Sequence, residues 1–425
     1  MKFHVRQNEI QQALNIIKTS KALGKQDEEL FSIIKIESFQ ENGKNRVRFT
    51  SANTIAWASS TLNDEYFEEL FGNDDYKEFF NVEECSTVFV DGHTLINVIS
   101  GYPDNTIINF DIKKKKKGDD EVSNLVCECS RNNKKEKKKS TFLVKIPSFF
   151  QETPPNEKRE SITIPAREFV EAVSAVEFAS STDDKQREFW GVFIEIRNGE
   201  VCSCATDKLR ICWYDKKGLS RDISGECFKL VPIKATLVAA LKGIDLKKDM
   251  TIECGEKFTI LRQNDRWHAI PNIVKSTQSD GSSFDWRTIA KGIHDAMCAS
   301  IRIPRKTLRE CAKLASSAGG EFGVRIHFDT KNKKTSFIVE KIEGGGGISC
   351  SHEEEILLED NQFDGEVDEI IILTIDSISE ISSRYNCDQV TFRIKNNDIP
   401  IEMLSEKDNF RFITGTVDPP GTGND

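Results

Sequence analysis

The apolar positions of the chain follow one pattern in three widely separated places. In each place, alternating apolar residues of a short strand lead, after a polar turn, into apolar residues at helical spacing. The segments read KFHVRQNEIQQALNII from Lys2, SITIPAREFVEAVSAV from Ser161 and SIRIPRKTLRECAKLA from Ser300. Their starts lie 159 and 139 positions apart, so each repeat has the length of a domain.

A second strand and helix recur late in each repeat. The segments are VFVDGHTLINVISGYPDNTIINF from Val88, KLVPIKATLVAALKGIDLKKDMTIEC from Lys229 and IILTIDSISEISSRYNCDQVTFRI from Ile371. Short strands with turn signals such as ENGKN and RNGE fill the rest. The sequence therefore predicts an α+β protein of three copies of one domain, each with two helices packed on antiparallel sheet.

The repeats set the expected domain boundaries. We predict domains at 1–155, 160–282 and 283–418, the last with its core from about residue 300, followed by a flexible tail at 419–425. The prolines of FFQETPPNEKRE mark the end of the first domain. The segment FDWRTIAKGIHDAM, before the third repeat, is expected to be helical and to pack against either neighbour.

Composition narrows the class of protein. The 425 residues are 38% apolar and 30% charged with a net charge of −10, which excludes a uniformly basic nucleic-acid coat. We see no apolar run long enough for a membrane helix and no signal peptide, so we expect no membrane partner and a protein that stays in the cytoplasm.

The twelve cysteines are expected to be reduced thiols, and most of them core residues. Cys127 and Cys129, like Cys202 and Cys204, are two positions apart in strand-like runs, which places each pair on one face of a strand. Neither a CxxC motif nor a histidine cluster is present, so no metal and no cofactor are predicted.

The repeats, with CATDKLRICWY in the middle one, FWGVFIE before it and STFLVKIPSFF closing the first, resemble the bacterial DNA polymerase III β subunit, the sliding clamp. The resemblance spans nearly the whole chain. It implies a homodimer of three-domain subunits that closes into a six-domain ring around duplex DNA, holds it without reading its sequence, and has no catalytic activity. Its expected partners are the replicative polymerase and the clamp loader, at the bacterial nucleoid.

Three sets of site residues follow. On the expected helix, Lys306, Arg309 and Lys313 lie on the side opposite Leu308, which faces the core, as expected of phosphate contacts. Lys242 has a similar position on the helix of the middle repeat. The resemblance adds Lys25. It also implies a groove for a short hydrophobic peptide, lined by Phe189, Thr206, Leu209, Arg210, Ile211, Pro271, Thr374, Ser377, Pro400, Ile413, Gly415 and Val417. For the dimer interface it implies Phe142, Val144 and Leu314.

The chain departs from the family where Lys208 and Leu209 replace a usual glycine and histidine, and where its last strand reads FITGTV. A different peptide preference is therefore expected, as in a distant or phage-related replication system. Two lysine runs, 113–117 and 134–139, flank the strand LVCEC and are expected to form two hairpin loops with solvated charge, with a nucleic-acid patch as the alternative.

Two other functions remain open on the sequence. A scaffold with clamp architecture that does not encircle DNA would carry the same repeats. A nucleic-acid-processing enzyme would need a catalytic centre, for which Asp207 is the one carboxylate to examine. The glycine run 344–347 lacks the lysine of a phosphate-binding loop and is expected to be a hairpin tip.

Overall fold

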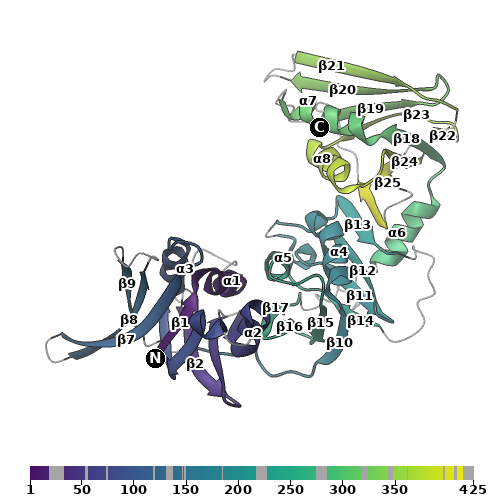
Figure 1. Ribbon diagram of the computed structural model, residues 1–425. Helices are drawn as coiled ribbons and strands as arrows, with labels where there is room; N and C mark the ends of the chain where they lie inside the picture. Colours follow the sequence, from purple (N-terminus) through teal and green to yellow (C-terminus); the bar gives the residue numbers. More distant parts are fainter. Residues whose placement is uncertain are drawn as a thin grey trace. The chain divides into compact units, whose positions relative to one another are not determined.

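The chain forms two compact units in the computed structural model (Figure 1). Unit 1 comprises residues 1–170 and 230–274, and unit 2 comprises 171–229 and 275–425. The structure describes residues 1–18, 33–52, 56–72, 75–117, 120–130, 137–145, 147, 150–183, 185–216, 227–273, 285–317, 324–342, 348–360, 362–395, 398–405 and 409–414.

Unit 1 contains two antiparallel sheets. The first has the strand order β5-β1-β7-β8-β9 and the second β10-β15-β16-β17-β4-β3-β2-β6. The strands are β1 (Lys2–Arg6), β2 (Ile33–Glu41), β3 (Lys44–Ala52), β4 (Trp57–Asn63), β5 (Phe80–Glu84), β6 (Ser86–Asp91), β7 (Ile107–Lys117), β8 (Asp120–Ser130), β9 (Lys137–Leu143), β10 (Glu160–Pro165), β15 (Asp249–Cys254), β16 (Phe258–Gln263) and β17 (Arg266–Pro271). Its helices are α1 (Gln7–Ile17), α2 (Asp64–Phe71), α3 (Gly92–Ser100) and α5 (Lys234–Leu241).

Unit 2 repeats this plan. Its larger sheet has the order β14-β11-β12-β13-β26-β25-β24-β18-β22 and its smaller one β21-β20-β19-β23. The strands are β11 (Phe193–Arg197), β12 (Glu200–Thr206), β13 (Arg210–Tyr214), β14 (Phe228–Leu230), β18 (Ala299–Pro304), β19 (Val324–Asp329), β20 (Lys334–Ile342), β21 (Ile348–Leu357), β22 (Phe363–Asp364), β23 (Asp368–Leu373), β24 (Gln389–Lys395), β25 (Asp398–Leu404) and β26 (Phe410–Thr414). The helices are α6 (Trp286–Asp295), α7 (Arg305–Ser317) and α8 (Ile375–Arg384), while α4 (Ala166–Val176) begins in unit 1 and continues into unit 2.

The strand and helix predicted at the start of each repeat are present in all three places. They are β1 with α1, β10 with α4 and β18 with α7. The apolar positions of the predicted helical series are buried, from Ile10 and Leu14 in α1 to Leu308 and Ala315 in α7. The late strand–helix pairs are also present, as β6 with α3, β14 with α5 and β23 with α8. The predicted α+β class is therefore confirmed.

Strands from neighbouring repeats share one sheet in each unit. In unit 1, β17 pairs with β4, and His268 lies opposite Ala58. In unit 2, β13 pairs with β26, and Ile211 lies opposite Ile413. The two compact units thus each contain part of the middle repeat, because its strands extend both large sheets.

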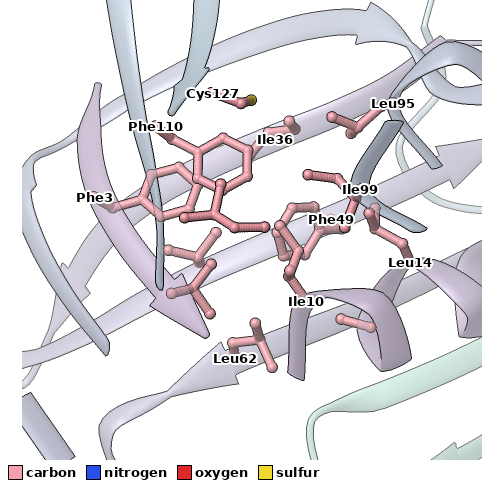
Figure 2. Close-up of a cluster of buried hydrophobic side chains, with 14 of the residues drawn as sticks. Phe3, Ile10, Leu14, Ile36, Phe49, Leu62, Leu95, Ile99, Phe110 and Cys127 are labelled. Carbon is pink, nitrogen blue, oxygen red and sulfur yellow. The ribbon is translucent and has the colours of Figure 1, made fainter. Parts of the chain in front are cut away.

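The core of the first repeat joins helices to both sheets of unit 1 (Figure 2). The rings of Phe3 and Phe110 stack with their centroids 4.5 Å apart, and Phe49 from the larger sheet is fully buried in the same cluster. Leu14 of α1 and Ile99 of α3 are also fully buried there. Burial of a large aliphatic or aromatic side chain contributes about 1.5–3 kcal/mol, so this cluster fixes how α1 and α3 lie on the sheets.

The predicted core placement of the two cysteine pairs is confirmed. Cys127, Cys129, Cys202 and Cys204 are free thiols and all four are buried. Burial raises the pKa of Cys202 to about 11, which keeps this thiol protonated and unreactive at neutral pH.

Candidate partner-binding site

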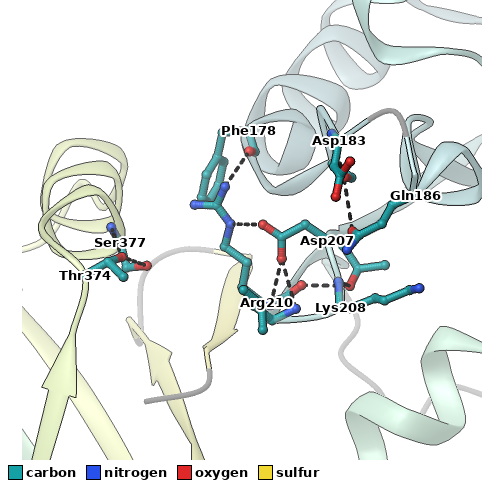
Figure 3. A network of polar contacts seen from close by, with 11 residues as sticks. Phe178, Asp183, Gln186, Asp207, Lys208, Arg210, Thr374 and Ser377 are labelled. Atoms are coloured by element: carbon teal, nitrogen blue, oxygen red, sulfur yellow. Dashed lines mark hydrogen bonds and ion pairs between the residues drawn. The ribbon is translucent and has the colours of Figure 1, made fainter. Parts of the chain in front are cut away.

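The turn between β12 and β13 holds several of the predicted groove residues in a fixed conformation (Figure 3). Asp207 Oδ1 accepts hydrogen bonds from the backbone N–H of Leu209 at 3.1 Å and of Arg210 at 2.9 Å. Thr206 Oγ1 donates to the carbonyl of Arg210 at 2.7 Å. Lys208 takes a left-handed φ of 76°, which lets the chain reverse within this short turn.

The same turn presents an exposed apolar side chain. Leu209 is 79% exposed, although its backbone is held by Asp207. Beside it, the Lys208 ammonium lies 5.2 Å from the centroid of the Phe189 ring and 3.3 Å from a Glu188 carboxylate oxygen. An apolar group on a rigid turn can contact a ligand with little loss of conformational entropy.

Two arginines meet at Phe178. Arg210 donates its Nε–H to Asp207 at 2.7 Å, and its guanidinium lies 5.8 Å from the Phe178 ring centroid. Arg384 of α8 lies 4.3 Å from the same centroid and donates to Glu380 at 2.9 Å. Asp207, the carboxylate that the sequence singled out, thus accepts hydrogen bonds from the turn backbone and from the Arg210 side chain, and it fixes the shape of the turn.

Ile211 and Ile413 lie on the other face of this sheet, under α6. They form a buried cluster with Trp213 and with Trp286 and Ala290 of α6. The helix predicted over FDWRTIAKGIHDAM is therefore present, and it packs on unit 2. Sequence reasoning did not include its residues in the site, although their amphipathic spacing was visible.

Buried charges fix both ends of α6. Near its start, Arg287 donates to Glu195 at 2.8 Å and to Asp215 at 2.9 Å. Burial disfavours the charged form of Arg287, but these two carboxylates outweigh burial and raise its pKa above the ordinary value. At the other end, His294 Nδ1 lies 2.8 Å from the buried carboxylate of Glu402, which also pairs with Arg393 at 2.9 Å.

The remaining predicted groove residues are distributed as follows. The side chain of Thr374 caps α8 by accepting from the Ser377 N–H at 3.2 Å and donating to its hydroxyl at 2.8 Å. Pro400 is half-buried in β25. Pro271 belongs to β17 in unit 1, and Gly415 and Val417 lie outside the described residues.

The predicted phosphate contacts lie on exposed helix surface. Lys306, Arg309 and Lys313 of α7 are all exposed, as the helical geometry predicts. Arg309 also donates its Nε–H to the Ser382 carbonyl of α8 at 3.1 Å. Lys242 is exposed at the end of α5, whereas Lys25 lies outside the described residues.

The predicted interface residues differ in exposure. Leu314 is 40% exposed and lines an open hollow of about 480 Å³ between α7 and β21. Phe142 is only 5% exposed and belongs to the core of unit 1, with Val144 packed against that core. Phe142 is therefore mainly a core residue at the edge of its sheet.

The described residues hold neither a membrane-length apolar helix nor a group of three His, Cys, Asp or Glu side chains placed to bind a metal.

Comparison with known proteins identifies the fold. No family model and no curated relative match the chain. Solved structures do match it. The DNA polymerase III subunit β of Pseudomonas aeruginosa is similar over 98% of this chain and 100% of its own, with a TM-score of 0.74 and 12% identity. The β subunit of Thermotoga maritima aligns over 98% of this chain and 99% of its own, with a TM-score of 0.73 and 16% identity.

The chain has the sliding-clamp fold. The β clamp of Helicobacter pylori, solved bound to a DNA ligase peptide, matches 98% of this chain and 100% of its own, with a TM-score of 0.70 and 15% identity. At such identities the likeness establishes the architecture of the chain and no more.

Proposed function

We propose that this protein is a DNA sliding clamp, a processivity factor that encircles duplex DNA and tethers the replicative polymerase and other partners. The observation that carries the proposal is the match of the whole chain to clamp structures, together with three strand–helix repeats joined through two shared sheets. In this function the protein would bind DNA and partner proteins without catalysing a reaction, and it would act at the bacterial nucleoid.

Partner peptides would bind on unit 2 around the β12–β13 turn. Leu209 and the rim of α6, where Ile289 is 45% exposed, supply apolar surface. Arg210 supplies a cation held in place by Asp207. Ligand sites of this kind combine apolar walls with a few fixed polar groups. The clamp loader would use the same surface as the polymerase.

The ring would be a homodimer of three-domain subunits with the boundaries predicted above, closed between the first domain of one copy and the third of the other. Leu314 and the hollow beside it lie on the third-domain side, and the edge of the sheet that contains Phe142 lies on the first-domain side. Contacts to DNA would come from Lys242 and from the basic face of α7, and would address phosphates rather than bases.

Retention on circular DNA tests this function. The protein is loaded onto a nicked plasmid by the clamp loader of its own cell, separated from free protein by gel filtration, and the plasmid is then cut once. A clamp stays on the circle and is lost from the linear form. Equal retention on both forms would indicate a scaffold bound to the side of DNA. Cleavage of labelled DNA with Mg²⁺ would instead indicate a nuclease.

A further inference from the structure

A polar hollow of about 320 Å³ lies on the outer face of the larger sheet of unit 1. On β3, Val47 and Phe49 face the core, so Arg48 and Thr50 between and after them lie on the opposite face and line the hollow. Its volume is at the lower end of the range for small-ligand sites. None of the residues proposed above for DNA, partner peptides or the dimer contact is among the described residues that line it.

The register of the strands sets the floor and walls of the hollow. Thr50 on β3 and Ser59 on β4 lie opposite each other and are both buried, with their hydroxyl oxygens 3.4 Å apart. Trp267 on β17 lies opposite Ser59 and is half-buried. Arg48 lies opposite Thr61 in the neighbouring row of side chains. The hollow thus has hydroxyl groups at its floor, an indole ring on one side and a guanidinium group on the other.

The connector between the first two repeats closes one side of the hollow. The indole N–H of Trp57 donates to the Gln151 carbonyl at 2.9 Å, and the Lys35 ammonium pairs with Glu152 of the connector. Further along, the Glu157 carboxylate accepts two backbone N–H groups where β16 begins, at 2.9 Å and 3.0 Å. The connector is therefore fixed on the sheet, and the hollow keeps its shape without a ligand.

Arg48 is the charged side chain at the hollow that has neither an ion pair nor a hydrogen bond among the described residues. Its guanidinium carbon lies 4.9 Å from the centroid of the Phe39 ring. A guanidinium group has five N–H donors, and an anion can accept two of them side by side. The other charged groups have polar partners, which are Glu37 with Lys35 at 2.7 Å, Glu152 with Lys35, Asp265 with Arg46 at 3.5 Å, Arg262 with Glu253, and Arg266 with the Gly243 carbonyl at 3.2 Å.

The carboxylates around the hollow select the charge of the anion. Glu37 lies directly opposite Arg48 on the neighbouring strand, and the side chains of Glu152 and Asp265 are both more than one third exposed. A phosphate dianion would place a second negative charge among these groups, which is unfavourable. A carboxylate carries the single charge that Arg48 can balance. N–H groups next to that carboxylate would find acceptors in the hydroxyl and carboxylate oxygens of the hollow.

We propose that this hollow binds the carboxyl end of a partner's peptide chain. The terminal carboxylate pairs with Arg48, the last backbone N–H groups donate to Ser59 and Glu152, and the last side chain packs on Trp267. Because the connector blocks one side, a chain can end in the hollow but cannot pass through it. The site belongs to unit 1, whereas the peptide surface proposed above belongs to unit 2, so the inference adds a second partner contact to the proposed function.

A pair of peptide pools tests the site. The probe is the pool Gly-Ser-Gly-Xaa-Xaa-Xaa, randomised at its last three positions and made once with a free carboxyl end and once as the amide. Peptides bound by the full chain after equilibrium dialysis are identified by mass spectrometry, and the most enriched one is titrated. Amidation and Arg48→Gln should each weaken its binding by about tenfold or more, because charge-assisted hydrogen bonds to the carboxylate are lost.

Two further variants separate recognition from folding. Arg48→Lys keeps the charge but not the two parallel donors, so its affinity should lie between those of the wild type and Arg48→Gln. Arg167→Gln removes the same charge from an exposed position on α4 in unit 1 and should bind the peptide like the wild type. Circular dichroism and thermal unfolding should match the wild type for all three variants.

Each outcome decides the proposal. Peptide binding that is unchanged by amidation or by Arg48→Gln overturns it, as does a pool from which the wild type enriches no peptide relative to Arg48→Gln. Binding of adenosine monophosphate that depends on Arg48, without peptide enrichment, would assign the hollow to nucleotides and also overturn it. Retention on circular plasmid is measured separately. The Arg48→Gln variant should be retained like the wild type, so failure of this site and failure of the clamp function are distinguishable.

Discussion

At the scale of single residues, His268 gives a prediction for stability against pH. It lies buried in β17, and burial, with a smaller effect of nearby Arg266, lowers its pKa from 6.5 to about 4. The unfolded chain therefore binds a proton between these values that the folded chain does not. Stability present above pH 6.5 is lost as the pH falls toward 4.

We expect the free energy of unfolding to fall by about 2 kcal/mol from this residue alone between pH 7 and pH 5. The measurement is urea denaturation at both pH values for the wild type and His268→Gln. The variant should show a smaller loss on acidification than the wild type. An equal loss in both proteins would assign the pH dependence to other groups.

The sequence predicts the exposure of single side chains correctly where the apolar periodicity of one helix determines it. Lys306, Arg309 and Lys313 are exposed because the apolar series of α7 fixes which face is buried. Phe142 is different, since its neighbours on the core face come from distant strands. No local pattern reveals that Leu125 and Tyr102 enclose this end of β9, with the Tyr102 hydroxyl donating to Ser140 at 2.8 Å.

At the scale of elements, the repeats predicted the strand–helix pairs, because each pair combines two periodicities that both bury apolar side chains. The added helix α2 was missed. Its residues lie in DEYFEELF, which has no counterpart in the other repeats, and Phe67 is buried through ring stacking with Phe80, 4.6 Å between centroids. The helical nature of α6 was visible in its spacing, but its place on unit 2 depends on Glu195, Asp215 and Glu402, whose proximity the sequence does not show.

Removal of the Arg287 cation tests how α6 is held. Arg287→Met would leave the carboxylates of Glu195 and Asp215 buried beside a neutral side chain, which costs about 3–5 kcal/mol when one partner of a buried pair is lost. We expect lower stability of unit 2 and faster hydrogen exchange of the α6 amides, measured by mass spectrometry. Lys291→Met, on the exposed face of the same helix, should change stability by less than about 0.5 kcal/mol.

The Arg287→Met substitution also tests whether α6 supports partner binding. Ile211 and Ile413 keep their positions because Trp286 and Ala290 cover them. If α6 detaches, Ile211 and Ile413 beside the β12–β13 turn become exposed to water. The affinity for a partner peptide should then fall together with the protection of the α6 amides against hydrogen exchange. Loss of α6 protection with unchanged binding of a polymerase-derived peptide would place the site elsewhere on unit 2.

At the scale of the whole molecule, a net charge of −10 means that the proposed clamp would have to bind duplex DNA through a local basic surface. The exposed face of α7 offers three cations within two turns, and only one exposed acidic side chain, Glu310, lies among them, 3.7 Å from Lys306. Each phosphate contact releases counterions, so direct binding to DNA should weaken steeply with salt.

The triple variant K306S/R309S/K313S should therefore bind duplex DNA more weakly, and the slope of log affinity against log salt should become shallower by about 2.7, at about 0.9 per lost phosphate contact. The measurement is fluorescence anisotropy of a labelled duplex at several NaCl concentrations. The control K77S/K257S/K331S removes the same charge from exposed lysines elsewhere and should keep the wild-type slope. Because a closed ring holds DNA by topology, the α7 variant should still be retained on circular plasmid, whereas a protein bound to the side of DNA would lose retention and affinity together.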